Sequence, residues 1–176
     1  MALVKPVVFQ VVGYQNSGKT TLTTKLIKAL KDRGLKTVTI KHHGHGGKPD
    51  AADQKDSSKH LSAGAIASIV EGDGRLILQA ENFQHSLEKQ IELLKSFNPD
   101  VILIEGYKQE NYPKLLLVRD KQDLILLEMV KNVTAVVYWM EEMRDMITAK
   151  WSMPSFLIDD ETAIIWIAES IQRLKK

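Results

Sequence analysis

The sequence predicts an α/β fold in which a mostly parallel sheet is flanked by helices. Short apolar, β-branched segments alternate with segments whose apolar residues recur every three or four positions, which is the pattern of repeated β–α–β units. The first unit has an apolar segment at 7–12, a glycine-containing loop at 13–20 and an amphipathic helix at 21–31. After Gly34, which is expected to end this helix, a second apolar segment follows at 35–41. A crossover this short predicts two parallel strands with a right-handed connection.

The loop at 13–20 fits the pattern G-x-x-x-x-G-K-T of a phosphate-binding P-loop. Gly13 and Gly18 allow backbone angles and a close approach that a side chain would prevent. The loop amides are expected to point into one concavity, and the N-terminus of the following helix adds positive potential there. We expect Lys19 to reach the β- and γ-phosphates and the Thr20 hydroxyl to ligate Mg²⁺. The strand before the loop and the helix after it argue against a chance match, so the fold class is P-loop NTPase-like.

The rest of the chain is predicted to extend the sheet and to add one antiparallel hairpin. Further strands are expected at 101–105, 114–119, 134–138 and 155–158, and helices at 56–63, 87–97 and 161–174. The turn Gly72-Asp73-Gly74 between apolar segments at 67–71 and 75–79 predicts a hairpin, which we expect to lie on the otherwise parallel sheet. The segment 124–127 is compatible with a strand or with loop packing. We see no linker and expect a single nucleotide-binding domain over 1–176.

The composition excludes several classes of protein. The formal net charge of +2 is too balanced to indicate a nucleic-acid partner. The absence of cysteine excludes disulfides, thiolate metal sites and a cysteine nucleophile. No apolar run approaches membrane-spanning length, and the first residues lack the layout of a signal peptide. We therefore expect a cytoplasmic protein that has no membrane or nucleic-acid partner.

Two carboxylates are candidates for a magnesium site. A strongly apolar predicted strand ends in Glu105, the arrangement of a Walker B strand, whose acid holds Mg²⁺ directly or through water. Asp56 is the second candidate because its loop leaves the strand that follows the P-loop helix; its alternative role is to cap the next helix. We predict Thr20, Glu105 and Asp56 as metal ligands. Any catalysis is assigned to Lys19, Asp56 and Glu105.

The long loop at 42–55 contains three histidines, His42, His43 and His45. Three interpretations remain open: donors to phosphate or to a second anionic substrate, ligands of a transition metal, or solvated side chains. A magnesium role is disfavoured because Mg²⁺ prefers oxygen ligands. Three histidines within four residues are also poorly placed to face one tetrahedral ion. We favour contact with an anion.

The residue that reads the base is left open by the sequence. The segment 120–123 matches part of the N-K-x-D pattern, with Asp in place of Asn, and a charged turn is the simpler interpretation. Asp159 and Asp160 follow a predicted strand, and one of them is expected to cap the last helix. The tryptophans at 139, 151 and 166 are too scattered to form a stacking platform and are expected to be core or interface anchors.

Taken together, these motifs resemble the molybdopterin-guanine dinucleotide biosynthesis protein B (MobB) family. The resemblance rests on the segments 13–20, 40–45, 55–57, 63–65, 104–108 and 117–120. It implies a dimeric P-loop fold of the SIMIBI type, binding of GTP and Mg²⁺, weak GTP hydrolysis, and partnership with the guanylyltransferase that joins GMP to molybdopterin. Molybdopterin itself is a further candidate ligand. One departure is that Trp139-Met140 stands where relatives often have Ser-Asp, which leaves a base-reading role of this segment unsupported.

The motif and the resemblance together define a predicted nucleotide site. Its residues are Gly13, Gln15, Asn16, Ser17, Gly18, Lys19, Thr20, Thr21, His42, His43, His45 and Lys108. A homodimer is expected from the resemblance, and the edge of the predicted hairpin would be available for pairing. Two alternatives remain: a metal-delivery GTPase that uses the histidine loop, and a small-molecule kinase of the dethiobiotin synthetase kind. The absence of cysteine counts against the first, and the second lacks an identifiable acceptor pocket.

Overall fold

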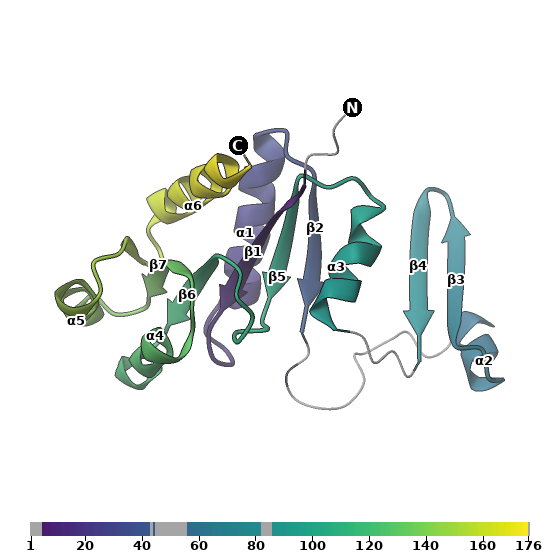
Figure 1. Cartoon of the computed structure of the whole chain (residues 1–176), viewed down its shortest axis with the longest axis horizontal. Coiled ribbons are helices and arrows are strands. Elements are labelled where there is room, and N and C mark those ends of the chain that lie inside the picture. The colour runs from purple at the N-terminus through teal and green to yellow at the C-terminus, as the bar shows by residue number, and fades with distance from the viewer. Residues whose placement is uncertain (1–4, 43, 45–55, 82–85, 176) are drawn as a thin grey trace. The chain divides into compact units, whose positions relative to one another are not determined.

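The computed structural model describes residues 5–42, 44, 56–81 and 86–175 (Figure 1). The chain divides into two compact units, one formed by Met1–Gly44 with Gln90–Lys176 and the other by His45–Lys89. The expectation of a single domain stays a prediction. Among the described residues, no helix has the length and apolar character needed to cross a membrane.

The first unit is built on a six-stranded sheet in the order β2-β5-β1-β6-β7-β8, in which every neighbouring pair is parallel. The strands are β1 (Val7–Val12), β2 (Thr37–Lys41), β5 (Val101–Glu105), β6 (Lys114–Val118), β7 (Val133–Tyr138) and β8 (Ser155–Leu157). Because all strands are parallel, their carboxyl ends lie at one edge of the sheet, where open α/β sheets bind ligands. The predicted parallel sheet is confirmed, and its strand boundaries shift by two residues at most.

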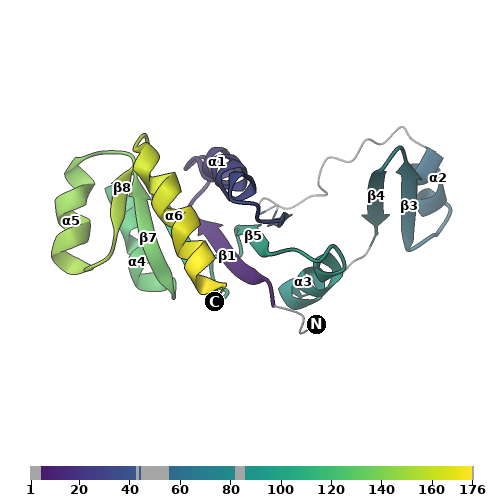
Figure 2. The same cartoon turned by 90° about the horizontal axis from the view of Figure 1, so that it is seen from above.

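Helices cover both faces of this sheet. On one face, α1 (Lys19–Asp32) and α6 (Glu161–Leu174) lie side by side and pack on alternate residues of the central strands, such as Val11 and Leu117 (Figures 1 and 2). On the other face, α4 (Leu126–Met129) and α5 (Glu142–Lys150) pack on the residues in between. Each large apolar side chain buried in this way stabilises the fold by roughly 1.5–3 kcal/mol. Most of α3 (Leu87–Lys95) also belongs to this unit.

Two elements of the first unit differ from the sequence-based expectation. The apolar segment at 124–127 is helical, since a 3₁₀ turn (Lys121–Ile125) leads directly into α4. The reason is a local cap: the Asp120 carboxylate accepts hydrogen bonds from the backbone N–H groups of Gln122 and Asp123. Helix α5 was not expected, because few of its residues are apolar and only two of them are buried.

The second unit contains α2 (Asp56–Ser62) and a hairpin of β3 (Ala67–Gly72) and β4 (Arg75–Ala80). The hairpin is confirmed, and its turn residues Asp73 and Gly74 both have positive φ, as a type I′ turn requires. Its expected position on the main sheet was wrong, because β3 and β4 form a separate two-stranded sheet. The two strands pair with each other over six residue pairs, and neither pairs with a strand of the main sheet among the described residues.

Candidate nucleotide-binding site

The loop between β1 and α1 has the backbone geometry of a P-loop. A methyl group on Gly13 would lie 2.8 Å from both the Leu117 carbonyl oxygen and the Ser17 hydroxyl, so only glycine fits there. Gly18 has a φ of 90° and forms the N-cap of α1 without a side-chain cap, which leaves the first N–H groups of the helix for a ligand. The Ser17 hydroxyl is buried, and no partner for it is found in the part of the chain that the structure describes.

The P-loop lysine is folded back onto its own loop. Lys19 Nζ donates a hydrogen bond to the Tyr14 carbonyl oxygen at 2.6 Å. Burial lowers the pKa of Lys19, and the nearby charges of Lys41 and Lys108 lower it further, against the opposing effect of Glu105. Three cations thus act on one small region. This is an environment that a polyphosphate would stabilise.

The predicted metal ligands Thr20 and Glu105 lie together at the carboxyl edge of the sheet. The Thr20 hydroxyl donates to Glu105 Oε1 at 2.8 Å. Lys41 Nζ is 3.2 Å from Thr20 Oγ1 and 3.5 Å from Glu105 Oε1. Strand register explains the meeting, because Val11, Lys41 and Glu105 are paired across β1, β5 and β2. A hydroxyl and a buried carboxylate are oxygen donors of the kind that Mg²⁺ prefers, so this pair fits the ion.

A buried glutamine that sequence reasoning missed positions the loop after β5. Gln10 Nε2 donates to the carbonyl oxygens of Gly106 and Tyr107 at 3.0 and 2.8 Å. This loop carries Lys108, whose Nζ lies 4.7 Å from the centre of the Tyr14 ring in the P-loop. Lys108 therefore lies beside the P-loop, and its contact with the nucleotide stays a prediction. The sequence signal for Gln10 was a single amide inside an otherwise apolar strand.

A second missed residue is Trp139, which directly follows β7. Its Nε1 donates to the Ser17 carbonyl oxygen at 3.0 Å, and its ring lies against Gly18. The expectation that Trp139 is a core or interface anchor therefore omitted its contact with the P-loop. Two residues considered as base readers have the local roles that were expected for them: Asp120 caps the 3₁₀ turn, and Asp160 caps α6 through the backbone N–H of Thr162.

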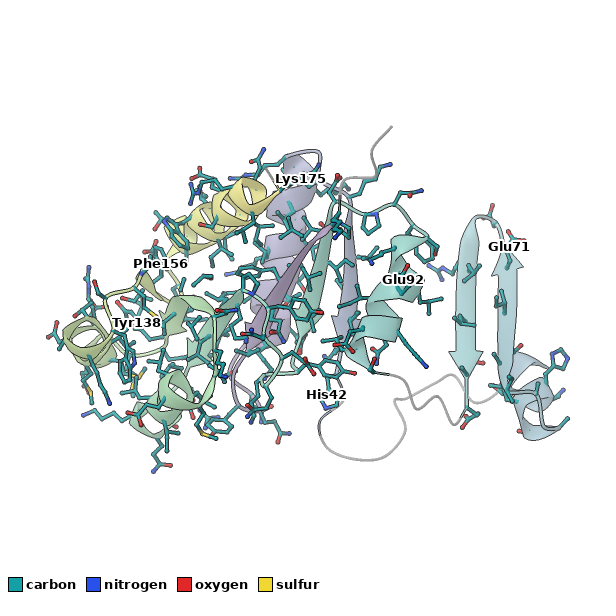
Figure 3. All side chains as sticks on the ribbon, viewed as in Figure 1. His42, Glu71, Glu92, Tyr138, Phe156 and Lys175 are labelled. Carbon is teal, nitrogen blue, oxygen red and sulfur yellow. The ribbon has the colours of Figure 1, made fainter. Side chains whose placement is uncertain are left out.

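Other predicted site residues are only partly placed. Gln15, Asn16 and Thr21 are exposed in the loop or at the start of α1. His42 follows β2 at the carboxyl edge of the sheet (Figure 3), and its ring lies 4.5 Å from that of Tyr107. His43 and His45 lie outside the described residues. Asp56 is the first residue of α2 in the second unit, and its side chain is likewise outside the description.

The transition-metal interpretation of the histidine loop has no support in the described ranges. Within them, no group of three or more histidine, aspartate or glutamate side chains is arranged to hold a metal ion. Because His43 and His45 are not described, the role of the loop remains a prediction.

Comparison with known proteins identifies the family. The family model described as molybdopterin guanine dinucleotide synthesis protein B, MobB, matches residues 8–139. A probable molybdopterin-guanine dinucleotide biosynthesis adapter protein of Bacillus subtilis is 37% identical over 174 residues, which cover 98% of each chain. The corresponding adapter protein of Haemophilus influenzae is 36% identical over 127 residues, 72% of this chain and 71% of that one.

Solved structures agree with this result. The crystal structure of Bacillus subtilis MobB has a TM-score of 0.77 and 35% identity, covering 93% of this chain and 96% of that chain. A MobB homologue from Bacillus stearothermophilus has a TM-score of 0.74 and 34% identity, covering 94% of this chain and 98% of that chain. Neither comparison favours a metal-delivery GTPase or a small-molecule kinase. This chain, with its P-loop and its Thr20–Glu105 pair, belongs to the MobB family of molybdopterin guanine dinucleotide synthesis proteins.

Proposed function

We propose that this protein is a GTP-binding adapter in the biosynthesis of molybdopterin guanine dinucleotide. In this role it supports the guanylyltransferase that joins GMP to molybdopterin. The relatives that match 98% and 72% of this chain are named as adapter proteins of this biosynthesis, which supports the proposal. Hydrolysis of GTP is at most slow in this proposal, and the main task of the site is to bind the nucleotide. The protein would act in the cytoplasm.

The observation that carries the proposal is the contact between Thr20 and Glu105 at 2.8 Å, at the start of the helix that follows the P-loop. In this proposal, Lys19 leaves the Tyr14 carbonyl oxygen and binds the β- and γ-phosphates. Thr20 and Glu105 would hold Mg²⁺, which neutralises phosphate charge when it is bound. Asp56 is proposed as a further carboxylate of the magnesium shell, and Lys108 as a second cation facing the phosphates.

The histidine loop is proposed to contact a second anionic substrate. The ring of His42 lies against Tyr107, which precedes Lys108 in the same loop. This contact supports a position of His42 near the nucleotide. His43 and His45 are proposed as further hydrogen-bond donors to the phosphate of molybdopterin. Replacing all three histidines with alanine should leave GTP binding unchanged and should reduce binding of the pterin phosphate. If the triple variant keeps wild-type pterin binding and dinucleotide yield, this part of the proposal is wrong.

We also propose that the protein is a homodimer that pairs through its hairpin. The antiparallel register places Ile69, Leu76 and Leu78 on one face of the hairpin, where they are 62%, 51% and 42% exposed. A contiguous group of exposed large apolar residues favours burial against another surface. A second copy of the chain offers the same surface, as a twofold symmetric interface requires.

The proposed function is tested by reconstitution. Purified guanylyltransferase, molybdopterin and limiting GTP are combined with and without this protein, and the yield of dinucleotide is measured. The proposal predicts a higher initial rate or yield when the protein is present. If the protein is folded and binds GTP but the yield is unchanged at every GTP concentration, the proposed adapter role is wrong, although the proposed nucleotide site is not.

A further inference from the structure

The indole of Trp139 connects two parts of the first unit that are far apart in the sequence. Its Nε1 donates to the Ser17 carbonyl oxygen at 3.0 Å, across 122 positions of the chain. A methyl group on Gly18 would lie 3.4 Å from Trp139 Cζ2, so the ring rests against the start of α1. The backbone N–H of Trp139 donates to the carbonyl oxygen of Val118, the last residue of β6. The indole is therefore held along one edge, although 43% of the residue remains exposed.

The strand order gives the nucleotide site a direction. β5, which ends in Glu105, lies on one side of β1, and β7, which leads to Trp139, lies on the other side with β6 in between. Thr20 and Glu105 are the candidate metal ligands, and the metal of a bound nucleotide sits at its terminal phosphates. If Mg²⁺ is held by Thr20 and Glu105, the terminal phosphates of a bound nucleotide would face β5. Because a nucleotide runs from phosphates through ribose to base, its base would then lie on the β7 side of the P-loop.

We propose that Trp139 forms the base subsite, in which the exposed part of its indole stacks against the purine of the bound nucleotide. The hydrogen bond to Ser17 holds the ring in place before the ligand arrives, so that little side-chain freedom is lost on binding. This inference rests on the proposed nucleotide binding. Every base has a π-face, so stacking adds affinity without distinguishing guanine from adenine.

The other two tryptophans have different surroundings. Trp166 on α6 packs against Phe156, with ring centres 5.6 Å apart, and Arg173 lies over it. Trp151 directly follows α5, and Lys150 Nζ lies over its ring. Among the described residues, the ring contacts found for these two tryptophans are with Phe156, Lys150 and Arg173, none of which belongs to the P-loop. Trp166 therefore provides a matched control, since Trp166→Phe makes the same chemical change elsewhere in the same unit.

The test compares ligands with and without a base. Titration calorimetry measures the affinities of GTP, ATP and inorganic tripolyphosphate for the wild type, Trp139→Phe, Trp139→Leu and Trp166→Phe, after circular dichroism has verified folding. Trp139→Phe keeps a ring and should change the affinity for GTP by about threefold or less. Trp139→Leu should lower the affinities for GTP and ATP alike by roughly tenfold, because base stacking is lost. Its affinity for tripolyphosphate should equal that of Trp139→Phe. Trp166→Phe should behave as the wild type for all three ligands.

Two results would overturn the inference. One is wild-type GTP affinity in Trp139→Leu; the other is an equal loss of GTP and tripolyphosphate, which would make Trp139 a support of the P-loop alone. A wild type that binds neither GTP nor ATP would instead overturn the proposed function. A second measurement leaves Trp139 intact: in the Trp151→Phe/Trp166→Phe variant, GTP and ATP should quench the remaining fluorescence more strongly than tripolyphosphate does. Equal responses to all three ligands would contradict stacking.

Discussion

The two compact units of this chain differ in how they treat their apolar side chains. In the first unit, the central strands β5 and β6 are buried along their whole length between layers of helices. In the second unit, β3 and β4 form an isolated hairpin whose large apolar side chains are exposed. The first unit therefore completes its core by itself, whereas the second unit gains from a covering surface. If the proposals of GTP binding by the first unit and of dimerisation through the hairpin are correct, variants in one unit should leave the function of the other unchanged.

The largest expected effect is that of Lys19→Ala in the first unit. GTP affinity should fall at least about 100-fold, because several charge-assisted contacts to phosphate are lost together. The fold and the oligomeric state should not change, since Lys19 is only partly buried and does not belong to the hydrophobic core. Calorimetry with GTP and sedimentation of the same samples measure both quantities. The control is Lys25→Ala, which changes an exposed residue of α1. Unchanged GTP affinity in a folded Lys19→Ala variant would contradict the proposed nucleotide site.

The complementary variant lies in the hairpin. Ile69→Ser with Leu78→Ser should weaken dimerisation by about 10- to 100-fold, since two apolar side chains would lose their cover, and GTP affinity should stay the same. Sedimentation at several concentrations gives the dissociation constant. Val70→Ser with Ile77→Ser changes one residue pair, which lies on the opposite face of the hairpin, and serves as the matched control. If the wild type sediments as a monomer at all working concentrations, the proposed homodimer is wrong.

A smaller effect is expected within the nucleotide site itself. Glu105→Gln and Thr20→Ala should each weaken GTP binding by about tenfold in the presence of Mg²⁺ and should have little effect without it, because each removes an oxygen ligand. Lys41→Met is the control, since it removes a contact to the same carboxylate but no metal ligand. Binding curves with and without EDTA separate the two conditions. If Glu105→Gln changes both conditions equally, Glu105 is not in the metal shell.

The smallest expected effect concerns the pH dependence of stability in the first unit. Hydrogen bonds from Lys175 and from the Lys36 backbone N–H lower the pKa of Asp100 below its ordinary value. A lowered folded-state pKa contributes stability above the unfolded-state pKa, and this contribution is lost as the pH falls through the lower folded-state value. Asp100→Asn should therefore cost about 1 kcal/mol near pH 7 and less in acid. Urea unfolding at both pH values measures this, with Asp32→Asn as an exposed control; an equal cost at both values would contradict the linkage.

The sequence was sufficient to predict those features that depend on neighbouring residues in the chain. The P-loop, Glu105 at the end of a buried strand, and the closing helix with Asp160 as its cap all follow from short patterns. The misses have non-local causes. Trp139 contacts Ser17 because β6 places the end of β7 close to the end of β1. Gln10 donates a hydrogen bond to a loop residue 96 positions away. Helix α5 was missed because its apolar pattern is sparse.

The separate two-stranded sheet of β3 and β4 is the other difference from the sequence-based expectation. Its strands and turn were correctly predicted, since Asp73-Gly74 fixes a type I′ turn. Whether a hairpin joins a larger sheet depends on edge pairing between distant segments, and a local pattern carries no information about that. For the same reason the sequence does not tell what covers Ile69 and Leu78, and assembly must be measured.

GTP bound at this P-loop is proposed to support the guanylyltransferase. The most direct measurement is the yield of molybdopterin guanine dinucleotide at limiting GTP, with the wild type and Lys19→Ala compared at equal concentration. The wild type should raise the yield, and Lys19→Ala, although folded and assembled, should not. An equal enhancement by both proteins would show that nucleotide binding at the P-loop is not what the adapter contributes.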